Sequence, residues 1–497
     1  MLHEVNMLGS SRFSITKSCG FVRVFAALFS LMLIWSLMLP LFAGPDEHSN
    51  FVKSAAVARG ELVGSNIAAT QTMSYWATQV NIDPRFGAAL GVPSCFIFAS
   101  DKPACDVPIE SIPTADTPAW TQMGRYPPLA FLISGLGTLF GPRDLSAFAS
   151  RTTIGMLCAF FVSIATYFLK KRGRTSIGVL MALTPGVVFL SAVASPSGSE
   201  ICAAIALWVL APELFASQSL SRFETFCIGL AGLFVMGSRP VGFVMYALIL
   251  GVSACLSWGR KGEWHKILTS RWLVASQLIG LMFSLWWFVY IYSYQTSPKV
   301  VDGIPAIARS EQLMSVVMHL PSVIEQAFGN YGWLDSPTPT LAFFMGAGLI
   351  LAVIGSRWRS TVMAVKISVF GLVVAVLFFV LFIDLQMYSM LLGFGLQGRH
   401  IMPLLVGIPI LVFWRSEWRG KGDYLIAGTW SVIMVWCGAS ALRRYSTGIK
   451  PLNAFEMFQH PMWIPPLGIW GSLSLLVAAS ALFGFDVVRP LAVHEGK

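Results

Sequence analysis

The chain has 497 residues, and 55% of them are hydrophobic while only 12% are charged. Soluble globular proteins carry about a quarter charged residues, so this composition excludes that class and indicates an integral membrane protein. The formal net charge of +10 could suggest nucleic-acid binding, but the basic residues cluster in short loops between apolar segments. That pattern is typical of cytoplasmic loops in membrane proteins, and we expect no nucleic-acid partner.

Apolar segments of about twenty residues predict transmembrane helices. The first lies at 24–43, and we expect it to be retained because no signal-cleavage site stands out. The prediction is an all-α integral membrane domain at 21–485 with about 12 spans, flanked by tails at 1–20 and 486–497. The later expected spans are 145–169, 175–194, 201–215, 225–237, 241–258, 273–294, 340–356, 367–383, 401–414, 424–441 and 466–485.

The segment 126–141 decides the orientation of the spans. If it crosses the membrane, the basic cluster from Lys170 to Arg174 falls outside, against the positive-inside rule. If it lies along the surface, that cluster and the later basic loops all fall inside. We therefore expect both termini in the cytoplasm and extracytoplasmic loops at 44–144 and 295–339. Most of the polar residues between spans lie on the outward side, where we expect the function.

Two carboxylates and an imidazole, Asp46, Glu47 and His48, follow the first span directly. Charges beside hydrocarbon are costly unless they bind or react, so these residues predict a reaction centre with a general base. The alternative is structural, with Asp46 capping a helix that begins at Glu47. In that case Glu47 pairs with Lys53 or Arg59. The residues alone do not decide between the two.

Charged and aromatic side chains at other outward-facing helix ends are candidates for binding an anionic group. Arg125 and Tyr126 open the surface segment, where an arginine can hold a phosphate, although an interfacial anchor explains the pair somewhat better. Arg239 breaks a hairpin of two apolar segments, and a charge at that depth usually lines a cavity. Arg399 and His400 open a later span, where a positive charge outside opposes the positive-inside rule and favours phosphate binding.

Further polar residues lie on the same outward side. The second outward loop ends in Trp333 and Asp335, which could form a stacking platform and a hydroxyl-binding carboxylate. An interfacial aromatic belt explains them equally well. Glu200 and Asp384 are additional carboxylates, for which we favour exposed loop positions.

Two of the eight cysteines, Cys95 and Cys105, lie ten residues apart in the first long polar loop. If that loop is outside the cytoplasm, a disulfide between them is a reasonable expectation. The Cys and His residues do not show the spacing of a metal site, so we assign no metal ligands.

Four short motifs occur in the order and topology of one known family. Over 21–485 the chain resembles a large bacterial family of membrane proteins catalogued as a domain of unknown function, which is similar to the C-type (GT-C) glycosyltransferases. The resemblance implies a GT-C-like helical core whose first extracytoplasmic loop carries juxtamembrane helices and an acidic motif. It also implies a sugar donor carried on a polyprenyl phosphate. The motifs are Gly44-Pro45-Asp46-Glu47-His48, Tyr126-Pro127-Pro128-Leu129, Gly332-Trp333-Leu334-Asp335 and Gln397-Gly398-Arg399-His400-Ile401-Met402-Pro403.

By position, Asp46 and Glu47 match the acidic motif of that family, and Arg399 falls where an arginine would face the donor phosphate. His400 departs from the pattern, because an aromatic residue is usual there. The resemblance therefore predicts a glycosyltransferase on the outer face of a bacterial plasma membrane. It would move a sugar from polyprenyl phosphate to a cell-envelope glycan or a lipid-linked acceptor.

Within this prediction we favour Asp46 as the base. We expect Arg399, together with Arg239 or Arg125, to hold the leaving phosphate. Such a donor needs no nucleotide or redox cofactor, and a divalent metal such as Mg²⁺ or Mn²⁺ at Asp46 is compatible but not required. The alternative is a transporter or flippase of lipid-linked sugars. Transporters often show paired broken helices, whereas one such break, at Arg239, is evident in the sequence.

Overall fold

The protein is built mainly from α-helices across the part of the chain that the structure describes. The computed structural model describes residues 5–66, 77–113, 118–215, 220–256, 270–294, 308–389, 396–418, 420–450, 453 and 455–490. In chain order the helices are α1 (Val5–Met38), α2 (Glu47–Ala58), α3 (Leu129–Gly137), α4 (Asp144–Lys171), α5 (Ile177–Ala182), α6 (Pro185–Ala192), α7 (Pro196–Phe215), α8 (Arg222–Gly237), α9 (Gly242–Cys255), α11 (Arg271–Trp286), α12 (Arg309–Gly329), α13 (Thr340–Trp358), α14 (Met363–Ser389), α15 (Gly398–Leu405), α16 (Gly407–Phe413), α17 (Lys421–Thr447), α18 (Glu456–Gln459) and α19 (Gly468–Val488). Shorter turns are the 3₁₀ helices η1 (Pro84–Leu90), η2 (Val92–Cys95), η3 (Ile109–Ser111) and η4 (Thr138–Phe140), and the π-helix η5 (Trp287–Tyr294).

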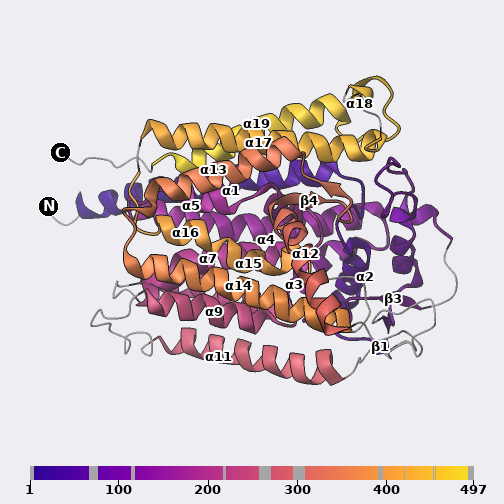
Figure 1. Ribbon diagram of the computed structural model, residues 1–497, viewed down its shortest axis with the longest axis horizontal. Helices are drawn as coiled ribbons and strands as arrows, with labels where there is room; N and C mark the ends of the chain where they lie inside the picture. The colour runs from indigo at the N-terminus through magenta and orange to yellow at the C-terminus, as the bar shows by residue number, and fades with distance from the viewer. Residues whose placement is uncertain are drawn as a thin grey trace.

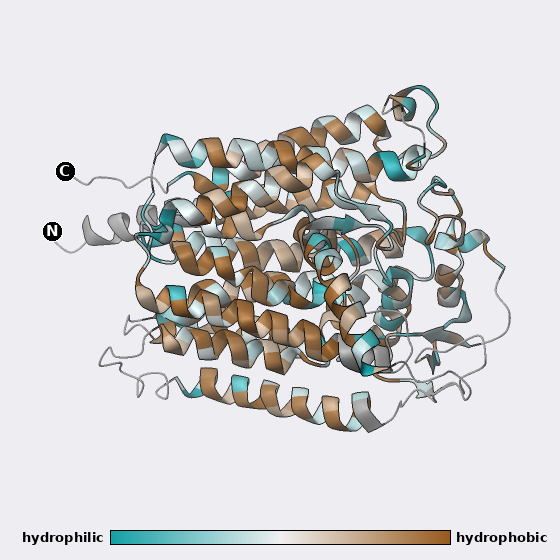
Figure 2. Cartoon of the chain, viewed as in Figure 1, coloured by the Kyte–Doolittle hydropathy of each residue, from teal (hydrophilic) through white to brown (hydrophobic). Residues whose placement is uncertain are grey.

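Most of the long helices run side by side along the longest axis of the molecule (Figure 1). Apolar residues are spread along these helices, while hydrophilic residues gather toward their ends and in the connecting loops (Figure 2). The chain is therefore a multi-pass, all-α membrane protein, as the composition predicted. Among the described residues, eight helical segments are long and apolar enough to cross a bilayer: Gly20–Met38, Asp144–Lys171, Pro196–Phe215, Arg271–Tyr292, Thr340–Trp358, Met363–Ile383, Lys421–Thr447 and Gly468–Val488.

The expected number of about 12 spans is not confirmed. Eight of the expected segments fall on the eight long helices. The expected spans at 225–237, 241–258 and 401–414 instead fall on helices that are shorter than a full span, and 175–194 is divided between two helices. Pro240 lies between α8 and α9, and Pro185 begins the second helix of 175–194.

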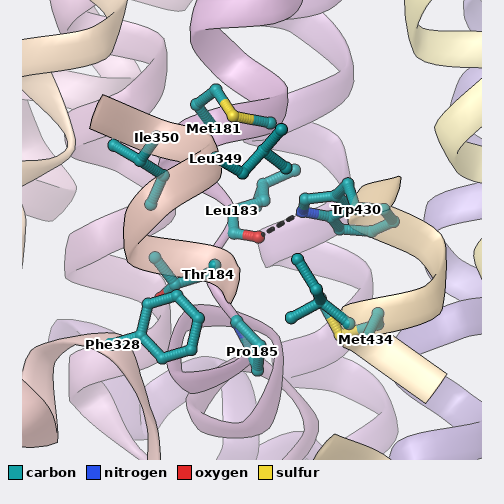
Figure 3. Close-up of a pocket in the computed structure, with 11 residues that line it drawn as sticks. Met181, Leu183, Thr184, Pro185, Phe328, Leu349, Ile350, Trp430 and Met434 are labelled. Atoms are coloured by element: carbon teal, nitrogen blue, oxygen red, sulfur yellow. Dashed lines mark hydrogen bonds between the residues drawn. The ribbon is translucent and has the colours of Figure 1, made fainter. Parts of the chain in front are cut away.

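The expected span 175–194 is wrong as one continuous helix, because it breaks between α5 and α6. Pro185 has no backbone N–H and begins α6, and the Thr184 side chain caps the first turn of that helix. The break leaves the carbonyl of Leu183 without a helical partner, and Trp430 Nε1 donates to it over 2.8 Å (Figure 3). Apolar side chains from α5, α12, α13 and α17 surround this contact (Figure 3). A tryptophan side chain from α17 thus donates a hydrogen bond to the backbone carbonyl that the helix break leaves unpaired.

The first outward loop packs two helices against the membrane domain. The segment 126–141 forms only α3 and η4, which agrees with the expectation that it does not span. It fits between α2 and α4 through two glycines: a Cβ on Gly135 would lie 2.6 Å from Ser54 O, and one on Gly137 would lie 2.2 Å from Ser150 N. The loop also contains an antiparallel sheet made of β1 (Ser65–Asn66), β2 (Thr78–Val80) and β3 (Ala119–Thr121).

The second outward loop, expected at 295–339, is largely helical where it is described. Residues 295–307 lie outside the described part of the chain, and α12 then follows as a helix of 21 residues. It packs against α6, α14 and α15 and so belongs to the helical body. A two-stranded antiparallel hairpin follows, made of β4 (Asn330–Tyr331) and β5 (Ser336–Pro337).

Ion pairs tie helix ends together at the end of the molecule where α1 begins and α19 finishes. Arg23 of α1 pairs with Asp486 of α19 over 2.9 Å, and Arg174, just after α4, pairs with Glu213 of α7 over 2.5 Å. Figure 1 places α2 and the strands β1 and β3 at the opposite end. The basic residues Arg23 and Arg174 and the described part of the first outward loop therefore lie at opposite ends of the bundle.

Candidate active site

Asp46 lies in the turn between α1 and α2, with a left-handed backbone of φ 58°. The helix α2 begins at Glu47 as expected, but the Asp46 side chain makes no capping hydrogen bond, so the expected capping role is wrong. A capping side chain normally needs an extended backbone at its own residue, which Asp46 lacks. Its carboxylate instead accepts a hydrogen bond from Arg399, with 2.6 Å between Nη2 and Oδ2.

Arg399 brings a positive charge to this turn from the first turn of α15. Its Nη1 also donates to the backbone carbonyl of Pro45 over 3.3 Å. The side chain of Arg399 is 10% exposed and that of Asp46 is 25% exposed, so the ion pair is shielded from water but still reachable. Pro45, Asn330, Leu334 and Arg399 line a small crevice at this place. A substrate group in the crevice would meet the arginine directly.

A second arginine, Arg239, is buried at the break between α8 and α9. Its Nε lies 3.5 Å from Oε2 of Glu200. The favoured expectation of an exposed loop position for Glu200 is wrong, because α7 already begins at Pro196 and buries that side chain. Arg239 also interacts electrostatically with Arg399 and Asp46. Arg239 therefore lies within electrostatic range of the Asp46–Arg399 pair, while its own ion-pair partner is Glu200.

His400 has a structural contact at the start of α15. Its Nδ1 accepts a hydrogen bond from the backbone N–H of Gln397 over 3.1 Å, which satisfies a donor ahead of the helix. His400 also lies within electrostatic range of Arg239 and Arg399. The side chain of Asp384 lies outside the described residues.

Arg125 contacts Tyr292, and its neighbour Tyr126 lies within electrostatic range of Arg239. The Arg125 guanidinium stacks 4.1 Å from the ring centre of Tyr292 and donates to the Tyr292 carbonyl. Burial lowers the pKa of Arg125 to about 10, so the group stays charged at neutral pH. Tyr126 and Tyr292 both interact electrostatically with Arg239. Sequence reasoning missed Tyr292, which the apolar aromatic run around it concealed.

Glu47, the other candidate base, is buried in an ion pair with Arg151 of α4. Each side chain is 1% exposed, and the two Arg151–Glu47 hydrogen bonds measure 2.6 and 2.8 Å. The carboxylate also accepts from the backbone N–H groups of Gly44 and Ala194, each over 2.9 Å. Arg151 donates in addition to three carbonyls near the end of α1, those of Ser36, Leu39 and Pro40. This pair joins the first turn of α2 to α1, α4 and α6.

The alternative partners expected for Glu47 are wrong. Lys53 donates to the backbone carbonyls of Leu62 and Gly124, and Arg59 donates to Ala55 and Thr138. Sequence reasoning missed Arg151, although a lone arginine inside an apolar span was a usable signal.

His48 and Trp333 are in contact, with their ring centres 5.0 Å apart. Burial lowers the pKa of His48 to about 4 despite the nearby charges of Asp46 and Glu47, so its ring is neutral at physiological pH. Trp333 Nε1 donates to the backbone carbonyl of Phe42 over 3.1 Å. The fold therefore brings Trp333 to the start of α2.

Asp335 is held in an ion pair with Arg444 of α17, over 2.8 Å. The Arg444 side chain is 1% exposed, and sequence reasoning missed it because it was assigned to a loop. Cys95 and Cys105 form the expected disulfide, with their Cα atoms 6.2 Å apart. Arg444 also donates to three carbonyls within the disulfide loop, those of Phe96, Ala99 and Lys102.

Backbone strain is concentrated around this site. Among the described residues, the non-glycine positions with positive φ are Phe42, Asp46, Phe98 and Leu334. Leu334 lines the crevice, and Phe42 and Phe98 both contact Trp333. Such conformations cost about 1–3 kcal/mol each and persist where the surrounding structure enforces them, most often at functional sites. These four strained positions therefore lie around Asp46 and Trp333.

The residues at Asp46 do not fit a divalent-metal site. Within the described ranges, no three His, Cys, Asp or Glu side chains are grouped so that they could hold a metal ion. The charged group beside the Asp46 carboxylate is the guanidinium of Arg399.

Two solved structures are similar to this chain, and both are of ArnT from Cupriavidus metallidurans. The apo structure has a TM-score of 0.44 and 14% identity, and the match covers 95% of this chain and 78% of that chain. The structure bound to undecaprenyl phosphate has a TM-score of 0.42 and 13% identity, over 96% of this chain and 78% of that chain. A likeness at these scores assigns neither an activity nor a ligand to this chain.

Curated proteins and family models give different results. No curated protein matches this chain. The model of a family described as "Predicted membrane protein (DUF2142)" matches residues 29–408. This match covers more than half of the 497 residues and confirms the expected family of unknown function. The chain belongs to the DUF2142 family of predicted membrane proteins.

Proposed function

We propose that this protein is a GT-C-type glycosyltransferase that moves a sugar from a polyprenyl-phosphate donor to an acceptor hydroxyl at the outer face of the bacterial plasma membrane. The acceptor is a cell-envelope glycan or a lipid-linked glycan. The observation that carries the proposal is the ion pair between Asp46 and Arg399, with Arg239 close by. A carboxylate suited to proton removal and two cations suited to phosphate thus lie together in a helical membrane protein.

The proposed reaction uses these three side chains in one step. The acceptor oxygen bonds to the anomeric carbon of the sugar while Asp46 takes the hydroxyl proton. The bond from that carbon to the phosphate oxygen breaks, and polyprenyl phosphate leaves with the electron pair. Arg399 and Arg239 stabilise the negative charge that develops on the phosphate. The arriving phosphate would draw Arg399 away from Asp46 and so free the carboxylate to act as the base.

The two carboxylates differ in their availability for this step. Glu47 accepts hydrogen bonds from both Arg151 and the backbone, and its side chain is 1% exposed. Asp46 has a single ion-pair partner among the described residues, Arg399, and its side chain is 25% exposed. The geometry therefore supports Asp46 as the base and Glu47 as part of the framework that holds it.

The proposal places both termini in the cytoplasm and the site outside. The start of α1 and the finish of α19 lie at one end of the bundle (Figure 1). Lys170 and Arg174 lie at that same end, and the positive-inside rule assigns such residues to the cytoplasm. Asp46 and Arg399 lie at the other end, where the donor phosphate would sit at the outer surface.

Lipid binding by the purified protein in nanodiscs tests the phosphate site. Polyprenyl phosphate is the probe, and we expect Arg399→Gln to raise its Kd by about tenfold or more, because one charge-assisted contact is lost. Arg85→Gln is the matched control, since Arg85 is a 66% exposed arginine of the first outward loop that pairs only locally with Asp83. Equal affinity of the wild type and Arg399→Gln would contradict the assignment.

An assay of sugar transfer in proteoliposomes distinguishes the glycosyltransferase hypothesis from the flippase hypothesis. Radiolabelled polyprenyl-phosphate sugars are supplied together with a cell-envelope glycan fraction. The proposal expects label in the glycan and free polyprenyl phosphate as the second product. Movement of intact labelled lipid across the bilayer without any transfer would establish the flippase instead.

A further inference from the structure

An exposed phenylalanine is held rigidly beside the site. Phe98 lies in the loop closed by the Cys95–Cys105 disulfide and is 62% exposed. Its backbone has φ 52°, a left-handed conformation that bulky residues rarely adopt. A strained backbone that turns an apolar ring toward solvent persists only where the surrounding contacts enforce it.

Those contacts come from one buried guanidinium. Arg444 donates to the carbonyl of Phe96 over 2.9 Å and to the carbonyl of Ala99 over 3.2 Å, so it holds the backbone on both sides of Phe98. The same Nη2 pairs with Asp335 over 2.8 Å. Arg444 thereby locks the disulfide loop to the turn that carries Trp333.

The Phe98 ring belongs to a series of three aromatic side chains that leads to Asp46. Its centre lies 5.5 Å from that of Trp333, with the rings inclined at 73°. The Trp333 ring lies 5.0 Å from His48, and His48 interacts electrostatically with Asp46. We name Phe98, Trp333 and His48 the aromatic shelf. Its outer member, Phe98, is exposed, while Trp333 and His48 are buried behind it, 7% and 9% exposed, and connect it to the proposed base.

We propose that the aromatic shelf binds sugar rings of the acceptor glycan and presents one of its hydroxyls to Asp46. This inference rests on the proposed transferase function. The C–H faces of a sugar ring are apolar and pack on aromatic rings, while the hydroxyls stay hydrated or reach polar groups. The Asp46 carboxylate at the inner end of the shelf is 25% exposed and can receive such a hydroxyl.

The way in which Phe98 is held favours a sugar over the membrane surface as its partner. A membrane anchor needs only apolar area and tolerates a mobile side chain. Phe98 instead is fixed by a disulfide, by Arg444 and by a left-handed backbone, which together define the orientation of its ring. A defined ring plane is what stacking on a sugar requires.

Saturation-transfer difference NMR on the full chain in nanodiscs tests the shelf. The probes are short linear oligosaccharides of glucose, galactose and mannose. We expect ring C–H protons to receive saturation from the wild type, and Phe98→Leu to weaken binding about tenfold while Phe98→Tyr retains it. Leucine keeps the apolar area, so an anchor would survive that change. Phe455→Leu is the matched control, because Phe455 is 67% exposed in another loop.

The outcomes separate this inference from the proposed function. Equal sugar binding by the wild type and Phe98→Leu, or no saturation of any probe by the wild type, overturns the shelf. If sugar binding depends on Phe98 but the protein has no transferase activity, the aromatic shelf is a sugar-binding site and the proposed transferase function is wrong. If Phe98→Leu changes neither the rate of sugar transfer nor the KM for acceptor, the proposed role of the aromatic shelf is wrong and the proposed transferase function stands.

Discussion

Replacing Glu47 with glutamine should unfold or severely destabilise the protein rather than block its chemistry alone. The carboxylate is surrounded by four donors: Arg151 Nε and Nη2, and the backbone N–H groups of Gly44 and Ala194. A glutamine side chain has one acceptor oxygen, and its NH₂ group would face donors. Two of the four donors would therefore be left without an acceptor, and the buried Arg151 would lose its counter-charge.

The magnitude follows from these losses. Each buried donor without a partner costs about 1–3 kcal/mol. Removing one member of a buried ion pair costs about 3–5 kcal/mol in total, because the remaining charge stays buried. We expect Glu47→Gln to lose free energy of unfolding in that range. Asp46→Asn should lose only about 1–2 kcal/mol, because its 25% exposed side chain gives up one hydrogen bond.

The assay is unfolding of the purified protein in detergent, followed by fluorescence and by size-exclusion chromatography after heating. Glu47→Gln should unfold at a clearly lower temperature than the wild type, and Asp46→Asn should remain close to it. Asp46→Asn is the control, because it removes one negative charge from the same turn as Glu47→Gln does. If Glu47→Gln were as stable as the wild type and had no sugar transfer, Glu47 would be the catalytic group and this reasoning would be refuted.

Two further predictions follow from the outward loops. Burial holds the pKa of His48 at about 4 against 6.5 when unfolded, so the unfolded state binds more protons and stability falls as the pH drops from 6.5 to 4. The loss in the free energy of unfolding reaches about 3 kcal/mol. Thermal unfolding of His48→Gln, measured at a series of pH values, should no longer show this loss of stability between pH 6.5 and 4. If the stability of the variant fell with pH as steeply as that of the wild type, His48 would not be its cause. On whole cells, Cys95 and Cys105 should react with a membrane-impermeant maleimide only after reduction. Labelling without a reductant would show that the loop lacks the disulfide.

The membrane class and the end of the bundle at which Asp46 lies could be predicted because both depend on local sequence. The length of the apolar segments predicted the helical body, and the charge bias of the loops predicted which end would hold Asp46. The positive-inside rule likewise predicted that 126–141 lies along the surface. Pro185 is a signal for the interruption of 175–194, which the length and apolar character of that segment do not show.

The pairing of the charges could not be predicted, because packing decides it over long sequence separations. Glu47 is 104 positions from Arg151, and Asp335 is 109 positions from Arg444. Nearby basic residues were the natural expected partners for Glu47, but a buried carboxylate is satisfied by whichever cation the folded helices place against it. Asp46 shows a second limit, since aspartate is a favoured helix cap and only its left-handed backbone shows that it is not one here.

The turnover number of Asp46→Asn at saturating donor is the most direct test of the proposed reaction. Reconstituted wild type and variant are given the same radiolabelled polyprenyl-phosphate sugar and acceptor glycan, and binding of polyprenyl phosphate is confirmed for both. The account predicts a turnover number about 10²–10⁴-fold lower for Asp46→Asn, with donor binding largely kept, because general-base catalysis is lost. Asp101→Asn, an exposed outer aspartate paired with Lys450, should turn over normally. A turnover number for Asp46→Asn equal to that of the wild type would contradict the account.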